Sequence, residues 1–364
     1  MSLLVVLLAA AAILWSFTYK LNEYAITPGL SQPVGPLITV TGHPHAPVRR
    51  TIFLTDVYLT QLTIWQWLSD EIHPVHVELV PGSELTGGNV PASELTAQGY
   101  LEMYDSQNSA KVVAMRALGL TVTGNPAGVV VTAIAAQSPA LSELSVADRI
   151  VGANGHAVGD VCGLATALVG VRPDTSVPMD VERATISASG TISYAAPRTV
   201  SVRTEPVPRG AQSTGCPGVP DRTAWIGLGL EDGTSWTFPV DVTIDTAYIG
   251  GPSAGLAMTL GVMDALSKVS ITGGTKVAAT GTIDPQGQIG PVGGVPEKTI
   301  AVESAGATLF LVPPANYGQA KSAASPSLKV VAVSTLDQAL SAIRAAGGIT
   351  PVPFAEASLL RATS

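Results

Sequence analysis

The apolar run Leu3–Phe17 near the amino terminus sets the first constraint on what this chain can form. It contains 15 residues without a charged side chain, and Trp15, Tyr19 and Lys20 mark its end. Aromatic residues and a cation at such a boundary are typical of a segment that meets a lipid bilayer. The run is shorter than the roughly 20 residues that span a bilayer, and a cleaved signal peptide is the alternative. We expect a single-pass anchor over residues 1–20 in the cell membrane, with the rest of the chain on the extracytoplasmic side.

Composition excludes several classes of protein. The 364 residues carry 27 acidic and 19 basic side chains, a formal net charge of −8, so no positive surplus is available for nucleic-acid phosphates. Hydrophobic residues make up 46% and charged residues 13%, which excludes a disordered, highly charged protein. The two cysteines, Cys162 and Cys216, are too few for a disulfide scaffold or a cysteine-based zinc site. Their spacing fits a disulfide and two buried thiols equally well.

Turn residues and apolar patterns divide the chain into regions. Short β-rich runs between Pro and Gly turns are followed by a helical pattern that we expect to span 92–117. Strands and helices alternate in the last third of the chain, which predicts α/β or α+β packing. We expect six regions: an anchor (1–20), a membrane-proximal β region with the long helix (21–117), a β-rich domain (118–206), a Pro/Gly-rich linker (207–221), an α/β domain (222–346) and a tail (347–364).

The positions of the histidines limit the chemistry of residues 222–346. All five histidines precede this region, so a Ser/His/Asp triad cannot form within it. The pairs His43/His45 and His73/His76 show neither an HExxH pattern nor a third ligand at helical spacing. We therefore expect solvated or packing histidines, no metal ion and no other cofactor.

A serine at the start of an apolar helical stretch is the first candidate for catalysis. Ser253 follows Gly251 and Pro252; the proline fixes the backbone at the helix entry, and the glycine lets a substrate backbone approach. The N–H groups of Gly251 to Ser253 at the positive helix end suit a developing oxyanion. A serine that only caps the helix is the alternative. A phosphate-binding loop is not expected, because Glu297 stands where the GxxxxGK[ST] pattern needs glycine.

A serine nucleophile needs a base, and without histidine the next choice is a lysine made neutral by burial. Of the five lysines in residues 222–346, only Lys298 has a special setting. It lies in the first turn of a helix that we expect Pro296 to begin and Gly306 to end. The positive helix end and the exclusion of water both lower the pKa of a lysine. Taken alone, Lys298 could instead be a solvated surface lysine. This alternative is less favoured when Lys298 is considered together with Ser253.

Two ordered motifs carry a family resemblance. GPSAGLAM, beginning at Gly251, and GTIDPQGQIGPVGGVPEK, ending at Lys298, resemble the Ser/Lys proteolytic domain of the Lon protease family over residues 222–345. The resemblance implies a serine endopeptidase with the ribosomal protein S5 domain 2-like α/β fold and a homo-oligomeric assembly. It implies Ser253 as nucleophile and Lys298 as general base. Thr280 would hold the lysine, and Gly251 and Pro252 would support the site.

Residues 118–206 carry a second resemblance. The segments SPA, DRIV and NG occur in the order seen in PDZ domains of the bacterial protease-associated kind. Such a domain would bind extended peptide ends by strand addition, and Leu118, Gly119 and Leu120 are the candidate carboxylate-binding loop. The alternatives are that these three residues only end the preceding helix and that the domain is an architectural β module. The whole layout resembles the membrane-anchored PDZ-Lon proteins of Gram-positive bacteria.

Taken together, these patterns predict a multidomain α+β protein. We expect an ATP-independent, membrane-anchored serine endopeptidase that acts through Ser253 and Lys298 on unfolded or exposed polypeptide segments, with neither nucleic acid nor ATP as a partner. The chain departs from the Lon pattern in lacking an ATPase module, and in having Gly250 where many Lon proteins have Asp. The alternative functions are a PDZ-based peptide-binding scaffold with an inactive Lon-like domain and an enzyme that cleaves only itself.

Overall fold

The computed structural model describes residues 2–72, 77–82, 92–187, 189–210, 213–247 and 249–354. His73, His76 and the last ten residues of the expected tail lie outside these ranges. The chain divides into two compact units, each described by itself below. Unit 1 comprises Met1–Thr39, His43–Gly88 and Ser253–Ser364, and unit 2 comprises Val40–Gly42 and Asn89–Pro252. The chain passes between them within β2 (Ile38–Thr41) and directly before Ser253.

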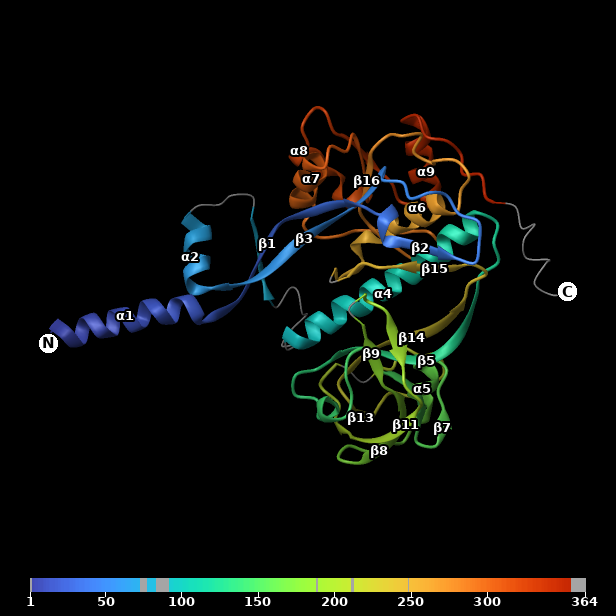
Figure 1. Ribbon diagram of the computed structural model, residues 1–364. Coiled ribbons are helices and arrows are strands. Elements are labelled where there is room, and N and C mark those ends of the chain that lie inside the picture. The colour runs from blue at the N-terminus through green and yellow to red at the C-terminus, as the bar shows by residue number, and fades with distance from the viewer. Residues whose placement is uncertain are drawn as a thin grey trace. The chain divides into compact units, whose positions relative to one another are not determined.

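Unit 1 is built on one mixed sheet whose strands come from both ends of the chain. The strand order is β20-β19-β16-β3-β1-β4. The strands are β1 (Lys20–Pro33), β3 (Ile52–Thr63), β4 (Glu78–Pro81), β16 (Val277–Ala279), β19 (Leu309–Val312) and β20 (Lys329–Ala332). β16 pairs in parallel with both β3 and β19, whereas β1 is antiparallel to β3 and β4. The expected membrane-proximal β region is therefore no separate region, because its strands complete this sheet; Figure 1 shows β1 and β3 as a long ribbon entering it.

Unit 1 also contains helices that come from both ends of the chain. They are α1 (Ser2–Thr18), α2 (Ile64–Ile72), α6 (Gly255–Ala265), α7 (Val295–Ser304), α8 (Tyr317–Ala323) and α9 (Leu336–Ala345), with short 3-10 turns η1 (Gly35–Leu37), η3 (Pro252–Ala254) and η4 (Pro314–Asn316) and the strand pair β17 (Thr282–Ile283) and β18 (Ile289–Gly290). α7 packs on β1 and β3, and α6 packs on β3 and β16. The core beneath α7 joins Phe53, Val295, Val302 and Phe310, all buried.

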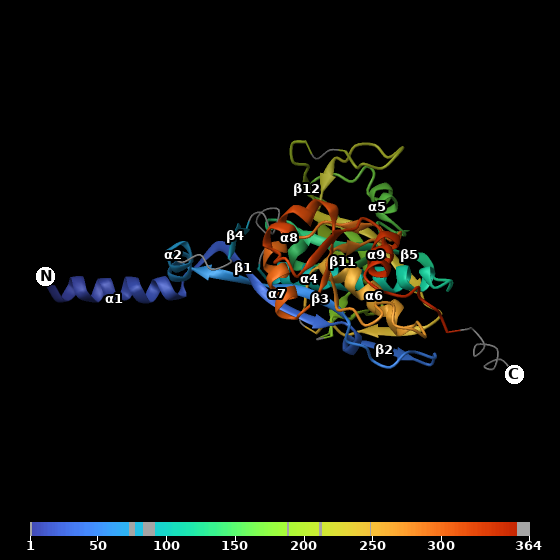
Figure 2. The same cartoon turned by 90° about the horizontal axis from the view of Figure 1, so that it is seen from above.

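The amino-terminal helix corrects the expected membrane-spanning anchor. α1 contains 17 residues and ends at Thr18, after which the chain enters β1 at Lys20. Within the ranges that the structure describes, no helix has both the length and the apolar character needed to cross a bilayer. Figure 2 shows α1 and α2 at the same end of the β1–β3 ribbon, where the Phe17 and Trp65 rings lie 4.9 Å apart.

Unit 2 combines the long helix with an antiparallel sheet. α4 spans Ala92–Ala117, as the sequence predicts. The strands are β5 (Thr123–Ile134), β6 (Arg149–Ala153), β7 (His156–Ala157), β8 (Ser176–Glu182), β9 (Ala184–Ile186), β10 (Ile192–Tyr194), β11 (Arg198–Arg203), β12 (Glu205–Pro206), β13 (Ala224–Trp225), β14 (Leu228–Thr237) and β15 (Asp241–Ile244), with η2 (Pro139–Ser142) and α5 (Val161–Ala167) between them. The main sheet has the order β11-β8-β6-β5-β14, and β7 pairs with β6. Val131, Ile150, Met179 and Leu164 form part of its core.

Two expected boundaries are wrong. β14 pairs with β5 from Leu228 to Thr237, so residues 222–237 belong to unit 2 and not to the α/β domain. Residues 207–221 do not link two domains either. β12 pairs with β13, and Cys216 is disulfide-bonded to Cys162 of α5, so the segment is a loop tied back onto its own unit. Proline and glycine signal irregular backbone, but they do not show what holds it in place.

Candidate functional site

Ser253 lies in the 3-10 turn η3, directly before α6. The N-cap of α6 is Ala254, and no side chain caps this helix. The Ser253 hydroxyl forms no hydrogen bond with any residue that the structure describes, and the side chain is partly exposed. The side-chain oxygen of a serine that caps a helix would accept a hydrogen bond from a backbone N–H of the first turn. The capping role is therefore not the one that Ser253 has.

The backbone of Ser253 is held by the segment that follows β16. The Ser253 carbonyl oxygen accepts hydrogen bonds from the Gly281 N–H at 2.9 Å and from the Thr280 hydroxyl at 3.2 Å. The Gly281 carbonyl in turn accepts from the Leu256 N–H at 3.1 Å. Thr280 itself is fully buried. These bonds fix the turn that presents the Ser253 side chain, and they give Thr280 a role that differs from the expected contact with Lys298.

Lys298 occupies the first turn of α7 and is 2% exposed. Gly294, the N-cap of α7, has φ 64°, and a Cβ there would approach Val57 of β3 to 2.9 Å. Glycine thus lets the helix start close against the sheet. The buried Val295 and the partly buried Val292 pack in the same core and exclude water. Burial lowers the pKa of Lys298 to about 8, and the negative charge of Asp56 on β3 opposes this shift only in part.

Asp56 is a residue of this neighbourhood that the sequence does not single out. Its Oδ1 accepts a hydrogen bond from the Leu30 N–H at 2.6 Å, at an irregularity in the pairing of β1 with β3. Burial raises the pKa of Asp56, while the Leu30 N–H and the charge of Lys298 lower it. No local motif marks this aspartate, because β1, β3 and α7 meet only in the folded unit.

The structure places Ser253 and Lys298 in the same unit without a hydrogen bond between their side chains. Bonds between catalytic side chains are often long in the absence of substrate and tighten when it binds. A partly exposed hydroxyl and a buried amine of lowered pKa are the two parts that a Ser/Lys dyad requires.

The expected oxyanion donors need a correction. Gly251 has φ 83° and donates its N–H to the carbonyl oxygen of Gly99 in α4, at 2.7 Å. Pro252 has no N–H at all, and its carbonyl oxygen accepts from the Ser106 hydroxyl at 3.1 Å. Both residues belong to unit 2. The segment Gly251 to Ser253 thus has two N–H groups, and only that of Ser253 is left for an oxyanion.

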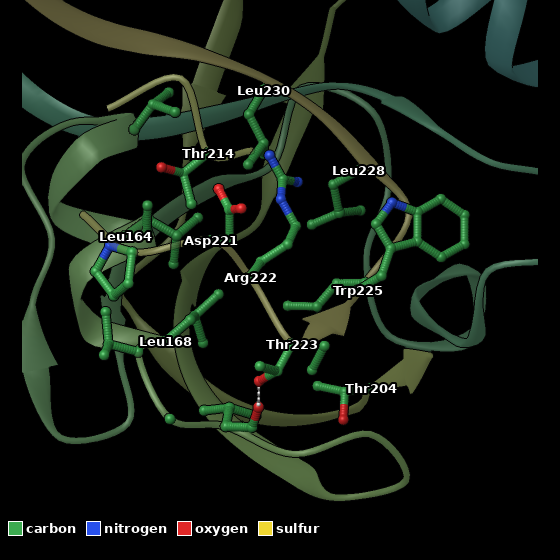
Figure 3. A pocket seen from close by; sticks show the side chains of 18 of the residues that line it. Leu164, Leu168, Thr204, Thr214, Asp221, Arg222, Thr223, Trp225, Leu228 and Leu230 are labelled. Atoms are coloured by element: carbon green, nitrogen blue, oxygen red, sulfur yellow. Dashed lines mark hydrogen bonds between the residues drawn. The ribbon is translucent and has the colours of Figure 1, made fainter. Parts of the chain in front are cut away.

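Unit 2 contains a separate groove between α5 and the start of β14. Its cavity has a volume of about 280 Å³. Figure 3 shows Leu164 and Leu168 on one side and Leu228 and Leu230 on the other, with Arg222 between them. Within the described part of unit 2, β14 pairs with β5 on one side only, so its other edge is open.

The loop before β14 offers two unpaired donors. The Ile226 carbonyl accepts from the Ser138 hydroxyl, and the Gly227 carbonyl accepts from the Ala135 N–H at 2.9 Å. The N–H groups of Ile226 and Gly227 make no hydrogen bond with a described residue. Gly227 has φ 76°, and a Cβ there would lie 2.8 Å from the Ser138 Cβ. This geometry turns both carbonyls into the unit and leaves the N–H groups for an anion.

Comparison with known proteins finds a family model for each of two segments of the chain. Residues 243–345 match the family model of the Lon protease (S16) C-terminal proteolytic domain, and residues 116–192 match that of the PDZ domain. This chain contains a Lon-type proteolytic domain and a PDZ domain. These matches confirm the resemblance to the Lon proteolytic domain, which rests on the motifs around Ser253 and Lys298. They also confirm the resemblance to a PDZ domain, which rests on the SPA, DRIV and NG segments.

Two curated relatives each match about a third of this chain. Lon protease 2 of Bacillus subtilis (strain 168) is 36% identical over 106 residues, which is 29% of this chain and 18% of that protein. Lon protease of Rickettsia bellii (strain RML369-C) is 30% identical over 122 residues, 33% of this chain and 16% of that protein. The chain thus spans less than a fifth of the length of these relatives. Among solved structures, the PDZ domain of an SdrC-like protein from Listeria monocytogenes is 14% identical, covers 28% of this chain and 86% of that chain, and has a TM-score of 0.21.

The candidate carboxylate loop of the PDZ domain has to be moved. The N–H groups of Leu118, Gly119 and Leu120 all donate to carbonyls of the last turn of α4, at Ala114, Arg116 and Met115. These residues end the helix and have no donor left for a peptide carboxylate. The run Ile226-Gly227-Leu228 has that capacity instead. The alternation of glycine with branched apolar residues in this run could have indicated the carboxylate-binding loop. The expected domain boundary at residue 222 was wrong, however, and it assigned the run to the proteolytic domain.

The histidines that the structure describes form no metal site. His43 and His45 are in the described part, and their ring nitrogens lie at hydrogen-bond distance from backbone carbonyls of Pro44 and His43. In the ranges that the structure describes, no three His, Cys, Asp or Glu side chains gather as metal ligands would.

Proposed function

We propose that this chain is a serine endopeptidase in which Ser253 and Lys298 form the catalytic dyad and which needs no ATP. The observation that carries the proposal is the burial of Lys298, because a lysine with a pKa of about 8 is neutral in a useful fraction of molecules near neutral pH. The match of residues 243–345 to the Lon proteolytic domain supports it. Unfolded or exposed polypeptide segments are the proposed substrates, since no nucleotide-driven unfolding step is invoked.

The reaction follows from the chemistry of the two side chains. As the Ser253 Oγ attacks the peptide carbonyl carbon, the neutral Lys298 amine accepts the hydroxyl proton. The resulting ammonium donates this proton to the leaving amine, and the C–N bond breaks to give an acyl-enzyme on Ser253. Lys298 then takes a proton from water, whose oxygen attacks the ester carbonyl and releases the second product. The proposed donor to the oxyanion is the N–H of Ser253, because it lies at the positive end of α6.

Matched single substitutions test this proposal. Ser253→Ala and Lys298→Ala should each lower cleavage of an unfolded casein-like protein by about 10³-fold or more without nucleotide. Ser322→Ala and Lys321→Ala change the same residue types at exposed positions of α8 and should leave cleavage unchanged. Circular dichroism and urea unfolding of all four variants check that folding is intact. Cleavage that survives in Ser253→Ala or Lys298→Ala would reject the dyad.

A fluorophosphonate label separates the peptidase from a scaffold with an inactive domain. A reactive Ser253 would be modified, and the Lys298→Ala variant would lose most of the label because its base is gone. A scaffold would leave Ser253 unmodified in the native chain. The intact mass of the chain after incubation without substrate tests for self-cleavage. An enzyme that cleaves only itself would show a loss of mass and would not cleave added substrate.

We also propose that the PDZ domain captures free carboxyl termini of polypeptides. The open edge of β14 provides backbone groups for an added strand. The unpaired N–H groups of Ile226 and Gly227 stand at the end of that edge, where a terminal carboxylate would sit. A labelled peptide with a free carboxyl terminus should bind the full chain, whereas the same peptide with an amidated terminus should bind at least tenfold more weakly, on the order of one charged hydrogen bond. Equal binding would contradict capture of the terminus.

The disulfide supports the proposal that the folded chain works in an extracytoplasmic, oxidising compartment. Cys162 and Cys216 are bonded to each other, and structural disulfides persist mainly outside the cytosol. Maleimide labelling of the chain, isolated from cells under acid quench, should modify neither cysteine before reduction and both after it. Free thiols in the isolated chain would place it in a reducing compartment.

A further inference from the structure

Arg222 is an exposed cation at the edge of a groove that is partly apolar. It lines the cavity between α5 and β14 together with Leu164, Leu228 and Leu230. Figure 3 shows its side chain reaching across this cavity toward the two leucines of β14. The guanidinium donates one hydrogen bond to the carbonyl oxygen of Ser213, at 2.6 Å, and forms no salt bridge with any carboxylate in the described ranges. Most of its hydrogen-bonding capacity is therefore free.

The segment that carries Arg222 is fixed at both ends. Upstream, the disulfide joins Cys216 to Cys162 of α5, with a Cα–Cα distance of 5.5 Å. Downstream, the Thr223 hydroxyl donates to the Val171 carbonyl oxygen at 2.7 Å, and β13 pairs with β12. A side chain on such a tethered segment loses less conformational entropy when it binds a partner than one on a free loop. Arg222 is thus part of the groove wall.

The geometry of β14 orients a bound peptide. With its carboxylate at the N–H groups of Ile226 and Gly227, a strand added antiparallel to β14 places its last residue beside Leu228. Its third residue from the end then lies beside Leu230. At the far end of the groove Asp232 accepts a hydrogen bond from the Val161 N–H at 2.8 Å, which joins β14 to α5. From Gly227 to Asp232 a strand spans roughly 17 Å, enough for the last few residues of a peptide.

We propose that Arg222 determines specificity in this groove, which takes free carboxyl termini with an apolar last residue and an acidic side chain two residues before it. The inference rests on the proposed capture of peptide termini by the PDZ domain. The leucine-lined cavity accepts the apolar side chain, and the free guanidinium N–H groups near Leu230 pair with an aspartate or glutamate of the peptide. The terminal carboxylate needs no second cation, since backbone N–H groups receive it.

Asp221 is the opposing charge in the lining. It precedes Arg222 in the chain, is exposed and also lines the cavity, but it forms no salt bridge with Arg222. Its carboxylate repels an acidic peptide side chain and so weakens the preference that Arg222 creates. Removing each charge in turn should therefore shift the preference in opposite directions.

Two short labelled peptides test the proposal on the full chain. Both end in a free carboxyl terminus, one with the sequence Asp-Ala-Leu and the other with Asn-Ala-Leu. Fluorescence anisotropy should show that the aspartate peptide binds about three- to fivefold tighter, as for a partly exposed ion pair. The advantage should shrink as sodium chloride is added, because salt screens exposed charges.

Three variants test whether Arg222 causes the preference for the aspartate peptide. Arg222→Gln should bind both peptides equally, and Asp221→Asn should increase the preference for the aspartate peptide. Arg209→Gln is the matched control, because Arg209 is exposed in the same loop and does not line the cavity.

Other results would contradict either the specificity role of Arg222 or the capture of peptide termini. Equal binding of both peptides to the native chain, or an equal loss of both in Arg222→Gln, overturns the specificity role while peptide capture stands. If neither peptide binds more tightly than its amidated form, capture of the terminus is overturned, and this inference with it.

Discussion

The Thr280 hydroxyl donates its hydrogen bond to the backbone carbonyl of Ser253 and not to the side chain of Lys298. The same carbonyl also accepts a hydrogen bond from the Gly281 N–H, so two donors from one segment hold the turn that carries Ser253. Thr280 therefore acts on the position of Ser253. The family resemblance had suggested that it acts on the lysine.

Replacing Thr280 distinguishes these two roles. Thr280→Val removes one of two bonds to the Ser253 carbonyl and should lower kcat/KM about fivefold, the effect of about 1 kcal/mol. The pH at which activity is half-maximal should not move, because Lys298 keeps its surroundings. Thr280→Ser keeps the hydroxyl and should retain most of the activity. A shift of the pH profile in Thr280→Val would show that the hydroxyl acts on Lys298 after all.

The pH dependence of cleavage should report the protonation of Lys298. With a pKa of about 8, Lys298 is neutral in only about a tenth of the molecules at pH 7, and the neutral form is the proposed base. We expect kcat/KM for a fluorogenic peptide to rise with pH and level off above about 8. An activity that stays flat from about pH 6 to about pH 9 would mean that another group acts as base.

Asp56 should set where this rise occurs. Its negative charge favours the ammonium form of Lys298, so Asp56→Asn should move the midpoint of the kcat/KM profile to lower pH. The asparagine oxygen can still accept from the Leu30 N–H, which preserves the strand pairing. Asp337→Asn, at an exposed position of α9, is the matched control and should leave the midpoint in place. A midpoint that moves to higher pH in Asp56→Asn would contradict the sign of this interaction.

The buried Lys298 should also lower the free energy of unfolding of the protein near neutral pH. The folded state holds this lysine with a pKa of about 8, against 10.5 for an ordinary lysine, so the unfolded state binds more protons between these values. Lys298→Met should therefore raise the free energy of unfolding by about 1 to 3 kcal/mol near pH 7.

The gain from Lys298→Met should fall as the pH rises from about 8 to about 10.5, where the wild-type lysine loses its proton in both states. Urea unfolding of the two proteins at several pH values measures this difference. Lys321→Met, exposed on α8, should show no comparable gain. A loss of stability in Lys298→Met at pH 7 would mean that the ammonium has compensating partners.

The disulfide should stabilise unit 2 by limiting its unfolded chain. Cys162 and Cys216 are 54 residues apart, and closing a loop of that length contributes about 4 kcal/mol in the chain-entropy model. The double variant Cys162→Ser/Cys216→Ser should unfold at lower urea concentration than the native chain. Reductant should lower the midpoint of the native chain and leave that of the double variant unchanged. A native midpoint that does not respond to complete reduction would contradict this role.

Features encoded by local sequence were predictable here. The periodicity of residues 92–117 gave the bounds of α4, and Pro296 with Gly306 placed α7 to within a residue or two. The apolar residues around Lys298 were enough to foresee its burial and the direction of its pKa shift. Each of these properties depends on residues within a few turns of one another.

Features that depend on distant strands were not predictable in this way. The pairing of β3 with β16 joins residues more than 200 positions apart, and the sequence of neither strand indicates which strand it pairs with. The same holds for the Ile226-Gly227 loop, which becomes part of the PDZ domain only through the pairing of β14 with β5. Asp56 was missed for this reason too, because it approaches Lys298 only once α7 has packed on β3.

The divided sheet of unit 1 has a consequence for translation. β1 and β3 leave the ribosome early, but the strand that pairs with β3 in parallel begins at Val277, after all of unit 2 has been made. A nascent or prematurely terminated chain that ends before this strand has the hydroxyl of Ser253 but neither Lys298 nor a completed sheet. We therefore expect the proposed Ser253/Lys298 pair to come together only on chains that extend past Lys298.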